Sequence, residues 1–151
     1  MKDKFVNLYI DWAHRVAELS HARRLKVGAV VVKDNHVTYG YNGMPMGWDN
    51  DCENVIGYHR GEPVYKTKPE VLHAESNAIA KLAKSNESAD GADLFVTHSP
   101  CIECAKLIHQ SGIRRVYYSE NYRDDSGLTF LKKSGILVEQ INLKVTNDSS
   151  N

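Results

Sequence analysis

The sequence has little cysteine, no long apolar run and no net charge, and each shortage excludes a class of protein. Its three cysteines, Cys52, Cys101 and Cys104, are too few and odd in number for a disulfide framework, so we expect a reducing compartment. No stretch approaches the roughly 18 apolar residues of a membrane-spanning helix. Residues 1–4 lack the apolar core of a signal peptide. We therefore expect a cytoplasmic protein with no membrane partner.

The formal charge balances, with 19 Lys plus Arg residues against 19 Asp plus Glu residues. A protein that grips a polynucleotide backbone usually has a basic surface, so this balance disfavours a nucleic-acid partner. A mononucleotide needs only one or two cations, which a neutral chain can supply. The length of 151 residues fits one domain. We expect that domain over residues 1–145 and a disordered polar tail over 146–151.

Apolar periodicity predicts an element order typical of an α/β domain. Helical spacing recurs over residues 4–19, 73–83, 100–110 and 128–133. Runs rich in β-branched and aromatic residues predict strands over 27–32, 37–39, 93–97, 115–119 and 136–141. The first two of these strands are separated by Asp34 and Asn35, which predicts a hairpin. Residues 41–72 show no sustained period and predict a long loop. We therefore expect a three-layer α-β-α fold on a mixed five-stranded sheet.

Two short motifs carry the chemistry, residues 73–75 (His-Ala-Glu) and 100–104 (Pro-Cys-Ile-Glu-Cys). We expect Ser99 to cap the helix of the second motif and Pro100 to occupy its first position. Cys101 and Cys104 then share one face of the first turn, where the helix dipole favours the thiolate that binds zinc. His73 opens the other helix and can supply a third ligand, which leaves one tetrahedral position of Zn²⁺ for water.

Glu75 is the candidate proton carrier. It lies two residues after His73, about 200° around the helix axis, so it can face the water instead of the ion. Zinc lowers the pKa of bound water, and one carboxyl can then pass protons to a ring nitrogen and to a departing amine. The alternative is a structural zinc site with a fourth protein ligand from Cys52 or His59. In the catalytic interpretation Cys52 is a buried small side chain.

The motifs resemble those of the cytidine deaminase superfamily and, within it, the deoxycytidylate (dCMP) deaminases. The resemblance covers residues 5–141 and is also carried by 26–30 (Lys-Val-Gly-Ala-Val), 40–47 (Gly-Tyr-Asn-Gly-Met-Pro-Met-Gly) and 110–113 (Gln-Ser-Gly-Ile). It implies a cytidine-deaminase-like fold, catalytic Zn²⁺ on His73, Cys101 and Cys104, and Glu75 as proton shuttle. The implied reaction is hydrolysis of dCMP to dUMP and ammonia, which supplies dUMP for thymidylate synthesis. Some relatives hold a second zinc between residues 50 and 72, where only Cys52 and His59 could be ligands here.

The same resemblance implies further contacts and partners. It places Asn42 at the sugar, Tyr122 against the substrate and the Ser99 carbonyl at the exocyclic amine. It also implies a homohexamer that dCTP activates with Mg²⁺ and dTTP inhibits, with an effector motif at Gly40, Tyr41, Asn42 and Gly43. Glycine lets backbone amides approach phosphate, and nearby cations offset its charge. Arg24 is the candidate cation for the effector and Lys26 for the substrate phosphate. The alternative is that these neighbouring cations form a solvent-exposed face, as clusters of charged residues usually do.

Other functions remain open from the sequence. A tRNA or other nucleobase deaminase shares the zinc motif but should be more basic. A free cytidine deaminase would lack a phosphate-binding cation, and a catalytically inactive, zinc-stabilised nucleotide sensor would not need Glu75. On the helix that carries Glu75, we expect Asn77 to bond the loop that carries Asn42.

Overall fold

A mixed five-stranded sheet forms the centre of the molecule, in the order β2-β1-β5-β6-β7. The computed structural model describes residues 1–143. The sheet strands are β1 (Gly28–Lys33), β2 (His36–Tyr41), β5 (Asp93–His98), β6 (Arg115–Glu120) and β7 (Leu137–Gln140). The helices are α1 (Asp3–Ala17), α2 (Ala74–Ala83), α3 (Ile102–Gln110) and α4 (Ser126–Lys133). Since β1 runs antiparallel to β2 and β5 while β5, β6 and β7 are parallel, the expected mixed sheet is confirmed.

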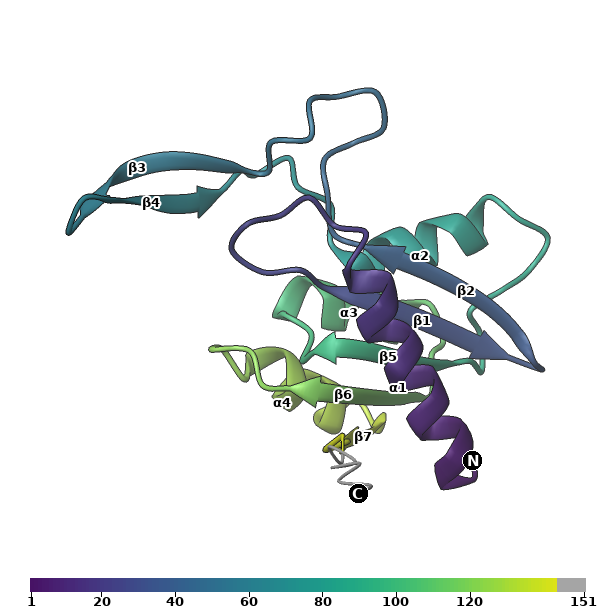
Figure 1. The fold of residues 1–151 in the computed structure, drawn as a ribbon. Helices are drawn as coiled ribbons and strands as arrows, with labels where there is room; N and C mark the ends of the chain where they lie inside the picture. Colours follow the sequence, from purple (N-terminus) through teal and green to yellow (C-terminus); the bar gives the residue numbers. More distant parts are fainter. Residues whose placement is uncertain (144–151) are drawn as a thin grey trace, which may run out of the picture.

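Helices cover both faces of this sheet, as the expected three layers require (Figure 1). Alternate residues of β1 point to opposite faces of the sheet. Val30 and Val32 pack with α1, and Ala29 and Val31 pack on the side of α2 and α3. Each side has its own apolar cluster, and all four residues are at most 5% exposed. Burial on both faces explains why β1 is a continuous apolar run instead of an alternating one.

The turn between β1 and β2 follows the prediction. Asp34 and Asn35 both have positive φ, 49° and 65°, which a two-residue hairpin turn requires. The register pairs Lys33 with His36 across this turn. The hairpin expected around these two residues is therefore confirmed.

The expectation of a loop without regular structure over residues 41–72 was wrong. This segment contains a β-hairpin of β3 (Glu53–His59) and β4 (Glu62–Thr67), which extends away from the rest of the domain (Figure 1). Most of its side chains are exposed, including Ile56 at 62% and Tyr58 at 75%. Backbone pairing holds the hairpin together without a buried face, so the sequence shows no regular burial pattern there.

The start of α3 also differs from the prediction, since Cys101 and not Ser99 is its N-cap. The Cys101 sulfur accepts a hydrogen bond from the backbone N–H of Cys104 at 3.5 Å. Ser99 instead extends the sheet, because its N–H donates to the Glu120 carbonyl at 2.9 Å. The helix therefore begins at Ile102, and Cys101 lies at its positive end.

Two sequence predictions concern the chain as a whole. None of the helices in residues 1–143 has the length and apolar character needed to cross a bilayer. The proposed domain end at residue 145 and the tail over 146–151 lie outside the described residues.

Candidate active site

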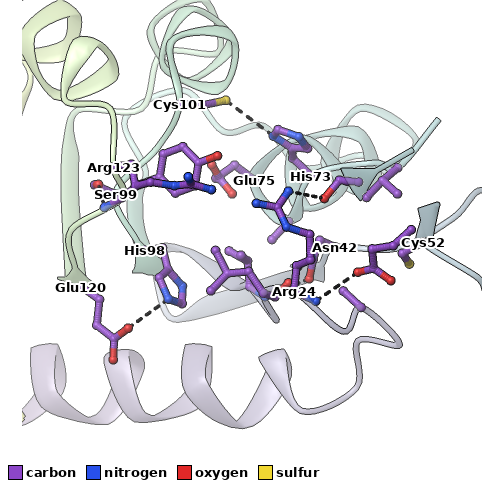
Figure 2. Close-up of a pocket in the computed structure, with 18 of the residues that line it drawn as sticks. Arg24, Asn42, Cys52, His73, Glu75, His98, Ser99, Cys101, Glu120 and Arg123 are labelled. Atoms are coloured by element: carbon purple, nitrogen blue, oxygen red, sulfur yellow. Dashed lines mark hydrogen bonds and ion pairs between the residues drawn. The ribbon is translucent and has the colours of Figure 1, made fainter. Parts of the chain in front are cut away.

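A cavity of about 390 Å³ opens where β5 and β6 end and α2 and α3 begin (Figure 2). Residues from the loop before β1, the end of β2 and the base of the β3–β4 hairpin complete its wall. Its polar and ionisable lining residues are Arg24, Asn42, Cys52, Glu53, Thr67, His73, Glu75, His98, Ser99, Cys101, Glu120, Asn121, Tyr122 and Arg123. The cavity thus brings together residues from both motifs and from segments far apart in the sequence.

The proposed metal ligands converge at the first turns of two helices. His73 is the N-cap of α2, Cys101 is the N-cap of α3, and Cys104 lies one turn further on. The Nδ1 atom of His73 is 3.5 Å from the Cys101 sulfur and 3.3 Å from the Cys104 sulfur. Tetrahedral Zn–N and Zn–S bonds of about 2.0 and 2.3 Å give an N···S separation of about 3.5 Å. The donor set therefore fits a tetrahedral zinc ion.

A fourth protein ligand is absent from this group. Within the described residues, His73, Cys101 and Cys104 form the group whose donor atoms all lie within 4.8 Å of one another, and neither Cys52 nor His59 joins it. Cys52 is 1% exposed and packs with Ala22 and Val71, as expected for a buried small side chain. Three protein ligands with one open position are typical of catalytic zinc, whereas structural sites have four.

Hydrogen bonding favours a thiolate at Cys101. Donation from the Cys104 thiol and from His73 lowers the pKa of Cys101 to about 4. The same bond to Cys101, together with burial, raises the pKa of Cys104. A divalent cation between the two sulfurs would reverse the effect on Cys104, because a coordinating thiol is deprotonated. Both sulfurs would then bind the metal as thiolates.

Glu75 is buried beside this group. It is 4% exposed and lines the cavity from the first turn of α2. Burial is the main cause that raises the pKa of its carboxyl, which favours the protonated form. A carboxyl that can both accept and release a proton suits general acid–base work.

Three predicted substrate contacts line the cavity: Asn42, Ser99 and Tyr122. The Ser99 hydroxyl accepts a hydrogen bond from the backbone N–H of Tyr122 at 2.7 Å, which ties the ends of β5 and β6 together. Asn42 braces the opposite wall, because its Oδ1 accepts from the Val27 N–H and its Nδ2 donates to the Leu25 carbonyl, both at 2.8 Å. Each of those two atoms can form one further hydrogen bond.

The remaining predicted contacts divide between the cavity and the surface. Arg24 lines the cavity, whereas the neighbouring Lys26 is exposed and lies outside the lining. Gly40, Tyr41 and Gly43 are also outside it. Gly40 lies against α2 so closely that a Cβ there would be 2.6 Å from the Ala78 nitrogen. Close packing of β2 on α2 is thus a sufficient reason for glycine at position 40.

The expected role of Asn77 is confirmed. Its Nδ2 donates to the Tyr41 carbonyl at 2.8 Å and so holds the segment that leads to Asn42. Helix α2 therefore carries Glu75, the candidate proton carrier, and also holds the segment of Asn42 at the cavity wall.

Sequence reasoning missed several residues of the cavity wall. Arg123 is a second cation in the lining, and Figure 2 shows it with Arg24 among the residues of the pocket. His98 donates through Nε2 to Glu120 at 3.0 Å, and both residues line the cavity. Glu53 comes from the hairpin that the sequence did not reveal. Arg123 directly follows Tyr122, a predicted substrate contact, so its position in the sequence could have drawn attention to it. No sequence pattern singles out Glu53.

Comparisons with known proteins agree with the site. The family described as "Cytidine and deoxycytidylate deaminase zinc-binding region" matches residues 3–120. Deoxycytidylate deaminase of Homo sapiens is 39% identical over 133 residues, which cover 80% of this chain and 72% of the human protein. ComE operon protein 2 of Bacillus subtilis (strain 168) is 37% identical over 141 residues, with coverages of 89% and 70%.

A solved structure is similar over almost its whole length. It is dCMP deaminase from the cyanophage S-TIM5 in complex with dCMP and dUMP, with 42% identity and a TM-score of 0.82. The match covers 93% of this chain and 99% of the phage protein. This likeness confirms the expected cytidine-deaminase-like fold.

Proposed function

This chain belongs to the cytidine and deoxycytidylate deaminase family and is a hydrolytic deaminase, and we propose that it converts dCMP and water to dUMP and ammonia. The observation that carries the proposal is one cavity lined by His73, Cys101, the buried Glu75 and two arginines, with the Cys104 donor grouped with His73 and Cys101 beside it. The complex of the similar phage enzyme with dCMP and dUMP supports the same substrate. In a cell this reaction supplies dUMP for thymidylate synthesis.

His73, Cys101 and Cys104 are the proposed zinc ligands. The two distances from the His73 nitrogen to the sulfurs match a tetrahedral site, and the N-cap position of Cys101 on α3 stabilises its thiolate. Bound zinc would act as a Lewis acid that lowers the pKa of water.

Glu75 moves the protons of the reaction. Its carboxylate takes a proton from the attacking water and delivers it to N3 of the pyrimidine while oxygen bonds to C4. A second proton then passes through the same carboxyl to the exocyclic amine, and the C4–N4 bond breaks to release ammonia. Its burial keeps bulk water away and raises its pKa, which favours the protonated form that donates to the amine.

The surrounding residues orient the substrate. In this proposal the Ser99 carbonyl accepts from the exocyclic amine, Tyr122 contacts the base and Asn42 binds the sugar with its remaining donor and acceptor. The bond from Tyr122 to Ser99 and the two bonds of Asn42 to backbone hold these groups in place before substrate arrives.

Arg24 and Arg123 are the proposed ligands of the 5′-phosphate. Both line the cavity, and guanidinium groups bind phosphate through paired N–H donors. They replace Lys26, which the sequence favoured for this role but which is outside the lining. Two cations also explain how a chain without net charge can bind a nucleotide.

Regulation by dCTP with Mg²⁺ and by dTTP, in a homohexamer, is proposed from the family resemblance. Activator and inhibitor must bind two conformations with different affinity. We expect sigmoidal dCMP kinetics that become hyperbolic with dCTP and Mg²⁺. Mass measurement in solution with and without each triphosphate tests the subunit number.

Ammonia release from dCMP, deoxycytidine, CMP and an adenosine-containing RNA, measured in parallel on zinc-loaded protein, tests the function. We expect the highest kcat/KM on dCMP. Preference for deoxycytidine would indicate a nucleoside deaminase, and preference for the RNA a tRNA deaminase. Zinc-loaded protein that binds dUMP but releases no ammonia would be a nucleotide sensor.

A further inference from the structure

The base of the β3–β4 hairpin contacts both the backbone and the guanidinium group of Arg24. The Glu53 Oε1 atom accepts from the backbone N–H of Arg24 at 3.2 Å. The Thr67 hydroxyl accepts from the Arg24 guanidinium Nη1 at 3.3 Å. Glu53 and Thr67 are cross-strand partners in the hairpin, so one rung of the β-ladder holds both contacts.

The Glu53 side chain is buried against the backbone N–H groups of Arg23 and Arg24. Its side chain is 1% exposed, although it comes from an otherwise exposed strand. The same Oε1 also accepts from the Arg23 backbone N–H at 2.8 Å. A buried carboxylate that accepts two backbone N–H groups fixes the direction of the chain at positions 23 and 24.

The two adjacent arginines consequently have different surroundings. Arg23 binds Asp51 at 2.6 Å and lies over the Tyr65 ring at 5.4 Å, so it is engaged by the hairpin and its flank. Arg24 lines the cavity, and Figure 2 shows its guanidinium bonded at the hairpin base. Arg23 is therefore held outside the cavity lining, while Arg24 is part of it.

We propose that Glu53 and Thr67 are positioning residues that hold Arg24 ready for the 5′-phosphate and so set the preference for a nucleoside monophosphate over the nucleoside. The inference rests on the proposed function, in which Arg24 binds that phosphate. A free arginine side chain loses rotamer entropy when it is fixed. Holding it beforehand removes part of that cost from substrate binding.

Thr67→Val tests the contact with little change of shape, and Glu53→Ala tests the backbone contact. The measurements are kcat and KM for dCMP and inhibition constants of dUMP and deoxyuridine. We expect about tenfold weaker binding of dCMP and dUMP, with kcat and deoxyuridine inhibition unchanged. Thr67→Ser and Glu53→Gln keep an acceptor oxygen and should restore binding. Glu62→Ala, an exposed glutamate at the far end of the same hairpin, is the matched control.

A double-mutant cycle with Arg24→Ala decides whether the two residues act through Arg24. We expect Thr67→Val to have no further effect on dUMP inhibition once Arg24 is alanine. Additive losses, or equal losses for dUMP and deoxyuridine, would overturn the proposal. If Glu53→Ala does not fold, Thr67→Val carries the test alone. Wild-type protein that binds dUMP without deaminating dCMP contradicts the proposed function only, and the inhibition ratios still decide the role of Thr67.

Discussion

The side-chain amide of Asn77 donates to the backbone carbonyl of Tyr41 at 2.8 Å, which joins the first turns of α2 to the end of β2. The residue after Tyr41 is Asn42, at the cavity wall, and two residues before Asn77 is Glu75. One hydrogen bond thus fixes the distance between the candidate sugar contact and the candidate proton carrier.

Replacing Asn77 by alanine should therefore disturb substrate binding. We expect a loss of about 1 kcal/mol in the free energy of unfolding and a higher KM for dCMP, with zinc content unchanged. Lys81→Ala is the matched control, because Lys81 also bonds a β2 carbonyl, that of Tyr39 at 2.7 Å, but further along α2. Denaturant unfolding and steady-state kinetics on both variants check the prediction, and equal KM values would contradict it.

Glu75→Gln should keep zinc and nucleotide but lose turnover. The amide is similar in size and remains in the buried position, yet it cannot take or release a proton. We expect kcat to fall by about 10²- to 10⁴-fold, with dUMP inhibition close to that of the wild type. Zinc analysis, product inhibition and ammonia release check this in one preparation. Stoichiometric zinc with near wild-type deamination would mean that another group carries the protons.

Cys101→Ser and Cys104→Ser should lose metal and stability together. Each removes one of three donors, and a metal that binds only the folded state stabilises it. We expect substoichiometric zinc and a Tm lower by about 5 °C or more. Cys52→Ser is the matched control, since Cys52 is buried but outside the donor group, and it should keep full zinc. Full zinc in both variants at positions 101 and 104 would show that the ligand set is different.

Burial of apolar side chains made several elements of the fold predictable from the sequence. The run of β1 and the helical stripe of α1 were recognisable because each packs against the sheet core. The β3–β4 hairpin was missed because its apolar side chains do not form a buried face. Its exposed apolar residues include Val55 at 49%, Ile56 at 62% and Tyr58 at 75%. Local propensity without burial leaves no pattern to detect.

The candidate site was likewise predictable from the sequence only in part. The motif spacing grouped His73 with Cys101 and Cys104, and the structure brings these side chains together. Arg24 lines the cavity, and its backbone is held by a long-range contact with Glu53, 29 positions away in the sequence. Spacing near Arg24 cannot reveal that contact, so it offered no reason to prefer Arg24 to Lys26 for the substrate phosphate.

Gly40 and Gly43 offer a test of the expected effector motif. A Cβ on Gly40 would collide with the Ala74 carbonyl oxygen of α2, whereas Gly43 has no heavy atom within 4 Å of such a Cβ. Gly40→Ala should therefore cost about 1–3 kcal/mol in the free energy of unfolding. Gly43→Ala should keep the Tm of the wild type.

The response to dCTP then separates packing from effector binding. If the stretch binds the triphosphate, the well-folded Gly43→Ala protein should need more dCTP for half-maximal activation, because a methyl group at position 43 limits the approach of phosphate. Initial rates at low dCMP, with Mg²⁺ and increasing dCTP, measure this against the wild type. An unchanged activation curve would place the effector elsewhere and leave packing on α2 as the reason for Gly40.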